Sequence, residues 1–133
     1  FFGIIDQENS SLEYSNAAHF PGSILCFDQG ASFLEIGGQP LGLYREPVYQ
    51  IHHVDLPEIY SIVMFSDGVF EILPQRTLGA KEEHLLSVVK CHQPGEDPGG
   101  MVDELIDHLG VLNASAIPDD IAVFTVASSG RPG

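Results

Sequence analysis

The segment Ile59–Phe65 is an apolar run of strand length that stops at Ser66-Asp67-Gly68. A strand with one face in water alternates apolar and polar residues, whereas this run offers apolar side chains to both faces. Both faces therefore have to be covered by other parts of a protein. We predict that Ile59–Phe65 is a strand covered on both faces.

The chain upstream of this run has the pattern of short strands and turns. Polar residues, glycine or proline, which favour turns, separate the apolar or alternating segments. The expected strands are Phe2–Ile5, Leu12–Ala17, Ser23–Phe27, Ser32–Ile36 and Val48–Leu56. The first two predict one hairpin, and the next two, on either side of Asp28-Gln29-Gly30, predict a second. On the last strand, His52 and His53 point to opposite faces and cannot bind one ion together.

Downstream of the run, the apolar spacing becomes that of helices. Lys81–His92 carries a stripe of leucine and valine residues and predicts a helix. A second helix is expected after Asp97, which can cap it with Pro98 at the first helical position. Ile121–Val126, rich in β-branched residues, predicts a last strand. Strands followed by helices favour an α+β fold over a doubly wound sheet.

Charge and composition exclude several classes of protein. The 133 residues include 5 Lys+Arg and 19 Asp+Glu, a formal net charge of −14 at pH 7 that repels the nucleic-acid backbone. No apolar run approaches the roughly 18 residues of a membrane span. Cys26 and Cys91 stand alone, which favours reduced thiols in a cytoplasmic protein over a disulfide framework or a zinc site. We expect neither nucleic acid nor a membrane as a partner.

Carboxylates stand next to two of the apolar strands. Asp67 follows Ile59–Phe65, and Asp119 and Asp120 precede Ile121–Val126. A carboxylate at the end of a buried strand is costly unless it is paired, hydrogen-bonded or bound to a metal. If the two strands are neighbours, the carboxylates converge into a site for Mg²⁺ or Mn²⁺, which could activate a water against a phosphoester. The alternative, a plain Asp-Gly turn and a capping aspartate, stays open at this point.

Four motifs occur together in one order. They are Tyr14-Ser15-Asn16-Ala17-Ala18-His19, Gln39-Pro40-Leu41-Gly42-Leu43, Met64-Phe65-Ser66-Asp67-Gly68-Val69-Phe70-Glu71 and Pro118-Asp119-Asp120-Ile121-Ala122-Val123. In order and spacing they resemble the bacterial branch of the metal-dependent serine/threonine protein phosphatases, typified by the sporulation stage II protein E and RsbU. The resemblance extends from Phe2 to Val126. The family usually has Asn-Ala-Gly-His where this chain has alanine at position 18.

The resemblance implies an α+β fold of the α-β-β-α type, with two central antiparallel sheets flanked by helices. It also implies two Mn²⁺ or Mg²⁺ ions and a metal-bound water that attacks phosphoserine or phosphothreonine. Asp67 and Asp119 match the family's metal-binding aspartates, so their catalytic role would act through the bound metal. Asp120 matches a position that is less regularly a metal ligand.

One part of the family pattern has no counterpart in the chain. The family's first metal motif, an aspartate followed by a Ser-Gly-His-Gly type loop, and the helical half that covers one sheet lie upstream. Together with the opening at Phe1 and Phe2, this predicts that residues 1–127 are the C-terminal part of the phosphatase domain and residues 128–133 a tail. We expect the isolated chain to bind metal weakly and to be inactive, because too few carboxylates remain to hold two cations.

The resemblance also implies partners. The usual substrate is a phosphorylated regulatory protein such as an anti-sigma-factor antagonist, and a receiver or sensor domain often lies upstream in the same chain, as in RssB-type response regulators. Because a partial domain exposes a sheet face or strand edge, a homodimer is among the expected assemblies. Two alternatives remain: a pseudophosphatase that serves as an interaction module of a sigma-factor regulator, and an α+β domain without metal.

Overall fold

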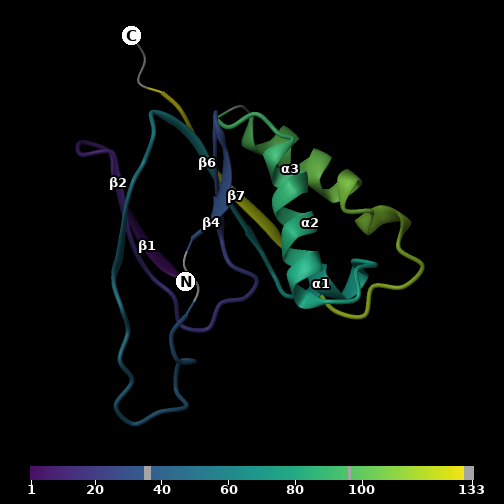
Figure 1. Cartoon of the computed structure of the whole chain (residues 1–133), viewed down its shortest axis with the longest axis horizontal. Helices are drawn as coiled ribbons and strands as arrows, with labels where there is room; N and C mark the ends of the chain where they lie inside the picture. Colours follow the sequence, from purple (N-terminus) through teal and green to yellow (C-terminus); the bar gives the residue numbers. More distant parts are fainter. Residues whose placement is uncertain (35–36, 96, 131–133) are drawn as a thin grey trace.

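The computed structural model describes residues 1–34, 37–95 and 97–130 (Figure 1). Most of the chain upstream of residue 66 is strand and loop, and the helices follow, as the change in apolar spacing predicts. The elements in chain order are β1 (Phe2–Asp6), β2 (Ser11–Ser15), β3 (Ile24–Phe27), β4 (Gly30–Phe33), β5 (His52–Asp55), β6 (Ile59–Phe65), α1 (Gly68–Ile72), α2 (Leu78–Lys90), α3 (Pro98–His108), the 3₁₀ turn η1 (Val111–Asn113) and β7 (Val123–Ser129).

The strands form two antiparallel sheets. One has the order β1-β2-β5, and the other has the order β4-β3-β6-β7. Both predicted hairpins are confirmed, since β1 pairs with β2 and β3 pairs with β4. Every pairing among the described residues is antiparallel, including the long-range pair β6–β7, whose register runs from Ile59 opposite Ser129 to Phe65 opposite Val123.

Strand β6 is covered on both faces, as its apolar sequence predicts. Ile62 points into a core between the two sheets, where it joins Leu12 of β2 and Leu25 of β3. Its neighbours Val63 and Phe65 belong to a second core between the four-stranded sheet and the helices. Because successive residues of a strand face opposite sides, one apolar run contributes to both cores. Each large aliphatic side chain buried in this way contributes about 1.5–3 kcal/mol.

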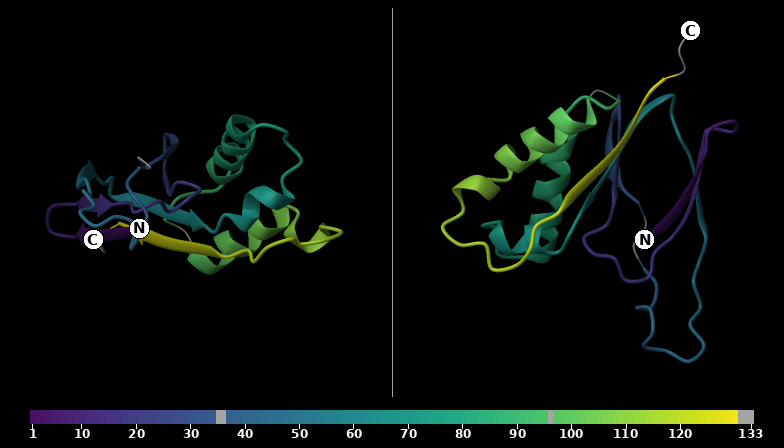
Figure 2. Two further views of the ribbon diagram at one scale, coloured as in Figure 1. Left: turned by 90° about the horizontal axis from the view of Figure 1, so that it is seen from below. Right: turned by 180° about the vertical axis from the view of Figure 1, so that it is seen from behind.

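The helices pack on the four-stranded sheet, and the three-stranded sheet packs on its other face (Figure 2). The arrangement is therefore α+β, and it contains the helix–sheet–sheet layers of the α-β-β-α sandwich that the resemblance implies. Phe2 and Ile4 on β1 are 70% and 56% exposed. Their cross-strand partners are Ser15 and Glu13, so these two apolar residues lie on the outer face of the three-stranded sheet.

The two predicted helices are present, and each is capped. Thr77 Oγ1 accepts a hydrogen bond from Ala80 N at the start of α2, three residues earlier than the expected start at Lys81. Asp97 Oδ1 accepts from Gly99 N at the start of α3, with Pro98 at the first position, as expected. The short helix α1 was not predicted, because five residues are too few to reveal a helical period.

Three predicted boundaries differ from the structure. Regular pairing on Val48–Leu56 is limited to β5, His52–Asp55. The last strand begins at Val123 instead of Ile121 and continues to Ser129, two residues into the expected tail. The end of the predicted strand Ser32–Ile36 lies at residues 35–36, outside the described residues. Strand ends depend on the neighbouring strand as much as on the local pattern, which explains such shifts. Within the described residues, no helix is long and apolar enough to cross a membrane.

Candidate functional site

The antiparallel pairing of β6 with β7 brings the candidate aspartates to one edge. Phe65, the last residue of β6, lies opposite Val123, the first residue of β7. Asp67 follows the end of β6 by two residues, and Asp119 precedes the start of β7 by four. In an antiparallel pair, the end of one strand adjoins the start of the other. The two carboxylates therefore belong to the same end of the four-stranded sheet, and we call this end the acidic edge.

Asp67 stands at the start of α1, and its side chain is exposed. Its carboxylate makes no capping hydrogen bond to α1. The next three residues are buried, and the ring of Phe70 packs edge-on against Phe20 with a centroid distance of 5.2 Å. The burial of Val69 and Phe70 anchors α1 on the core, and Asp67 is left at the water-facing end.

Ser66 ties the acidic edge together. Its backbone N–H donates to Ala122 O over 3.0 Å, which extends the β6–β7 pairing by one bond. Its hydroxyl donates to Asp120 O over 3.0 Å and accepts from Ala122 N over 2.8 Å. Residues 120–122 are therefore held against the end of β6.

Gly68 allows a close approach of the same segment. A Cβ at this position would lie 2.2 Å from Asp120 O and 2.9 Å from the Asp120 carbonyl carbon. Only glycine fits here, because side-chain carbons do not come so close to a backbone carbonyl. Ser66 and Gly68, the two neighbours of Asp67, thus both contact Asp120.

Asp119 and Asp120 are both exposed. Asp119 Oδ1 accepts a hydrogen bond from Asp120 N over 2.8 Å, which orients the Asp119 carboxylate relative to the backbone that Ser66 holds. The carboxylate of Asp120 is on the same segment. Their metal-ligand roles remain predictions.

The turn at Asn16–His19 lies within the electrostatic range of Asp67. Asn16 is buried, and its side chain accepts from His19 N over 2.7 Å and donates to His19 O over 3.1 Å. The motif is therefore held by the backbone of His19 and not by its ring. His19 Nε2 is buried and has no hydrogen-bond partner among the described residues. Burial lowers the pKa of His19, the amino terminus acts in the same direction, and the charge of Asp67 opposes them.

The lowered pKa of His19 predicts a pH dependence of stability. The folded protein binds a proton at His19 less readily than the unfolded chain, whose histidine pKa is about 6.5. The His19 contribution to the free energy of unfolding is therefore intact above about pH 6.5 and is lost as the pH falls toward the folded pKa. Urea unfolding of the metal-free protein between pH 7.5 and 5 measures this. His19→Gln should reduce the loss of unfolding free energy at low pH. If the variant and the wild type lose stability equally, His19 is not the group responsible.

Ala18 has a positive φ of 62°. This left-handed conformation costs a residue with a Cβ about 1–2 kcal/mol relative to glycine. Replacement by glycine recovers only part of this free energy, because glycine also makes the unfolded chain more flexible. Ala18→Gly should therefore raise the free energy of unfolding by about 1 kcal/mol. The control Ala17→Gly, at a neighbour without a positive φ, should lower it. The midpoints of urea unfolding measure both changes in stability. A loss of stability in Ala18→Gly would show that the backbone at Ala18 is not strained.

The donor atoms at the acidic edge fit a hard divalent cation in part. Asp67 and Asp119 offer carboxylate oxygens, the type of ligand that Mg²⁺ and Mn²⁺ prefer. One oxygen of Asp119 is engaged by Asp120 N. Among the described residues, however, no group of three or more His, Cys, Asp or Glu side chains could hold a metal ion. The edge thus resembles a part of a metal centre.

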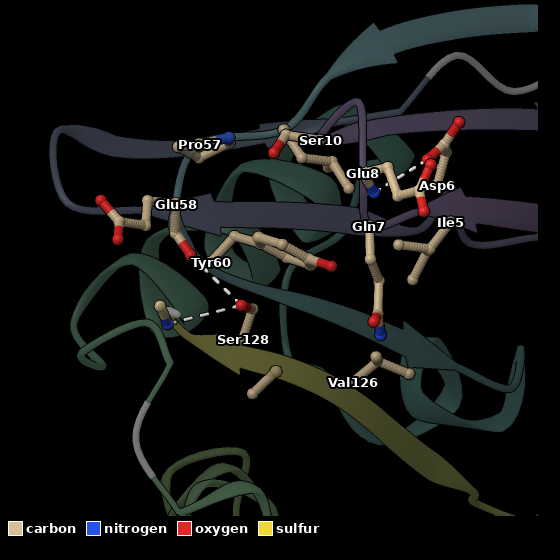
Figure 3. A pocket seen from close by; sticks show the side chains of 13 residues that line it. Ile5, Asp6, Gln7, Glu8, Ser10, Pro57, Glu58, Tyr60, Val126 and Ser128 are labelled. Carbon is tan, nitrogen blue, oxygen red and sulfur yellow. Dashed lines mark hydrogen bonds between the residues drawn. The ribbon is translucent and has the colours of Figure 1, made fainter. Parts of the chain in front are cut away.

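A cavity lies away from the acidic edge. About 720 Å³ in volume, it is bounded by the β1–β2 turn and by the opposite end of β6 and β7 (Figure 3). Asp6, Glu8 and Glu58 are among its lining residues. The Asp6 carboxylate accepts from Glu8 N, Asn9 N and Asn9 Nδ2, and these bonds, led by the one from the Asn9 side chain, lower its pKa. Asp6 thus serves the turn, and we base the candidate site on the acidic edge.

Two antiparallel sheets with helices on one side form a fold that is shared with a solved PP2C phosphatase domain. The sequence matches the stage II sporulation protein E (SpoIIE) family over residues 1–128. The chain therefore belongs to the SpoIIE family. A comparison with individually curated proteins gives no significant match.

Solved structures share the fold. The PP2C phosphatase domain with a fragment of the regulatory domain of SpoIIE from Bacillus subtilis has a TM-score of 0.77 at 20% identity, covering 95% of this chain and 36% of that one. A manganese-presoaked SpoIIE phosphatase domain has a TM-score of 0.71 at 18% identity, covering 99% and 57%. The RsbU and RsbW domains of Rv1364c from Mycobacterium tuberculosis have a TM-score of 0.72 at 23% identity, covering 98% and 36%. The chain thus spans between about a third and just over half of these solved chains.

Sequence reasoning named the aspartates but missed Ser66 and Gly68 as the residues that hold their edge together. The Ser-Asp-Gly motif contains both residues, but the sequence pattern indicated a role only for its central aspartate. The histidines His52 and His53 lie on opposite faces of β5, as predicted: His52 stacks on Tyr14, and His53 contacts Asp55 and Glu13 on the exposed face.

Proposed function

We propose that this chain carries the aspartate edge of a Mn²⁺- or Mg²⁺-dependent serine/threonine protein phosphatase. The observation that carries the proposal is the convergence of Asp67 and Asp119 at one end of the β6–β7 pair, in a chain of the SpoIIE family. The manganese-presoaked SpoIIE phosphatase domain supports the choice of cation.

In this proposal, Asp67 and Asp119 hold two cations through their carboxylate oxygens, and Asp120 joins them as a further ligand only once the missing ligands complete the site. When bound, the cations supply a Lewis acid that activates a water and offsets the charge of the phosphoryl group. The aspartates act as ligands and transfer no proton. Their exposure at the sheet edge leaves room for a phosphoserine or phosphothreonine of a protein substrate.

The remaining ligands of the two cations come from outside the described residues, since the described ones form no group of three. The family's first metal motif, an aspartate before a Ser-Gly-His-Gly type loop, would supply them from an upstream segment. The isolated 133-residue chain is then inactive, because the carboxylates of the acidic edge alone are too few to hold two cations against water. The substrate is a phosphorylated regulatory protein, of which an anti-sigma-factor antagonist is the leading candidate, and a receiver or sensor domain upstream controls the activity.

The test compares the full-length protein with the isolated chain on a serine-phosphorylated anti-sigma-factor antagonist and on p-nitrophenyl phosphate. The full-length protein should release phosphate in the presence of Mn²⁺ or Mg²⁺, and EDTA should stop this release. The isolated chain should release no phosphate. Turnover by the isolated chain would contradict the dependence on upstream ligands. A full-length protein that binds the phosphoprotein but releases no phosphate would instead support the pseudophosphatase alternative.

A further inference from the structure

We propose that the Ser66 hydroxyl is a positioning group that sets the spacing between the Asp67 and Asp119 carboxylates. The inference rests on the proposed function, because it concerns the geometry of the same cation site. Ser66 would perform this task through its hydrogen bonds to the backbone of the neighbouring segment.

The first step is the place of Ser66 at the end of the β6–β7 pairing. The regular register ends with Phe65 opposite Val123, and the bond from Ser66 N to Ala122 O adds one more connection. Beyond it, the hydroxyl continues the connection by donating to Asp120 O and accepting from Ala122 N. A side chain thus takes the place of a backbone partner where the strands separate.

The second step links this connection to Asp119. The peptide unit between Asp119 and Asp120 carries the N–H that donates to Asp119 Oδ1 over 2.8 Å. The carbonyl of Asp120, which belongs to the next peptide unit, accepts from Ser66. Asp119 is exposed, so it has little packing of its own to fix its side chain. Its carboxylate is therefore oriented by a backbone segment that Ser66 holds in place.

The third step is the position of Asp67 between Ser66 and Gly68. Ser66 holds Asp120 by a hydrogen bond to its carbonyl oxygen. Gly68 lets the same oxygen come close, since a Cβ at position 68 would lie only 2.2 Å from it. Both contacts come from residues directly bonded to Asp67. Any movement of the 119–122 segment therefore changes its position relative to Asp67, and the two carboxylates are kept in register.

The chemistry requires a short side chain that both donates and accepts. Serine and threonine hydroxyls have this property, whereas alanine leaves Ala122 N and Asp120 O to water. Because these groups are near the surface, water can replace the lost bonds at a cost of about 1 kcal/mol in stability. The ligand geometry suffers more, since removal of a group that orients a metal ligand commonly weakens metal binding 10- to 100-fold.

The opposite end of the same strand pair offers a matched control. Ser128 of β7 donates its hydroxyl to Glu58 O over 3.2 Å and accepts from Gly130 N over 3.4 Å (Figure 3). Glu58 directly precedes β6. Ser128 therefore also donates and accepts one bond, and its bond to Glu58 O joins the same two strands at the end that lacks Asp67 and Asp119, while its bond from Gly130 N is local. Ser128→Ala removes a hydroxyl that links the same strand pair without touching the acidic edge.

The experiment measures Mn²⁺ binding to the metal-free full-length protein by isothermal titration calorimetry, together with amide hydrogen exchange at Ala122. Ser66→Ala should weaken Mn²⁺ binding at least about tenfold and speed exchange at Ala122. Ser66→Thr, which keeps the hydroxyl, should stay within about threefold of the wild type. Ser128→Ala should lower stability by a similar amount and leave Mn²⁺ binding unchanged.

Two results would overturn the inference while the proposed function stands: wild-type Mn²⁺ affinity in Ser66→Ala, or an equal loss of affinity in Ser128→Ala. Faster exchange at Ala122 with unchanged Mn²⁺ affinity would also overturn it, because the bond would then be structural only. A wild-type protein that neither binds Mn²⁺ nor releases phosphate would refute the proposed function itself and the inference with it.

Discussion

Asp67→Ala and Asp119→Asn in the full-length protein will each lower the rate of manganese-dependent dephosphorylation by at least about a hundredfold, more than the effect typical of an outer-shell residue. The reason is the loss of a carboxylate from a site that offers few of them, since the described residues contain no group of three potential ligands. The measurement is kcat on the phosphorylated anti-sigma-factor antagonist with saturating Mn²⁺.

The two substitutions are chosen from the local structure. Asp67 makes no capping hydrogen bond to α1, so alanine removes the carboxylate without removing a cap. Asparagine at position 119 keeps an oxygen that can accept from Asp120 N. The metal-free variants should unfold at the temperature of the wild type or slightly above it, because crowded negative charge is relieved.

Asp103→Asn provides the control for the loss of one negative charge. Asp103 is an exposed carboxylate on α3, and its replacement should leave kcat and Mn²⁺ dependence unchanged. Wild-type kcat in the Asp67→Ala or Asp119→Asn variant would remove that residue from the mechanism. An equal loss of rate in Asp103→Asn would show that overall charge, and not coordination, explains the effect.

The second large effect is expected from Gly68→Ala, which should lower the free energy of unfolding by about 2–3 kcal/mol, as overpacking commonly does. The new Cβ would lie 2.2 Å from Asp120 O, a backbone atom that Ser66 also holds. The segment cannot rotate away as a flexible side chain would. Either the start of α1 or residues 120–122 must move, and both changes separate Asp67 from Asp119.

Gly79→Ala is the matched control for this substitution. Gly79 lies in α2, where an added Cβ would meet nothing within 4 Å. There alanine should stabilise the protein by up to about 1 kcal/mol, because it favours the helix over glycine. Urea unfolding measures both variants. Helix propensity favours alanine over glycine at both positions, so only the contact with Asp120 should make the two variants differ. A Gly68→Ala protein as stable as the wild type would show that this close contact is absent.

The sequence predicted the parts of the fold that depend on local patterns. The apolar run of β6 indicated burial on both faces, and the structure confirms it with Ile62 in one core and Val63 in the other. The cap at Asp97 indicated where α3 begins. The short helix α1 escaped notice because Val69 and Phe70 are held by tertiary packing and not by a helical repeat. The shortness of β5 was missed for a similar reason, since alternation continues beyond the four residues that find a partner.

The sequence by itself thus determined which segments are buried, that Asp97 caps α3 and which acidic residues stand at strand ends, because apolar spacing and turn chemistry are local properties. Only the tertiary structure decided that β6 and β7 are neighbours, so that Asp67 and Asp119 share an edge. It alone also assigned Ser66 and Gly68 to the backbone of Asp120. The physical reason is that a periodic pattern reports whether a residue is covered, while the identity of its partner depends on the packing of the whole chain.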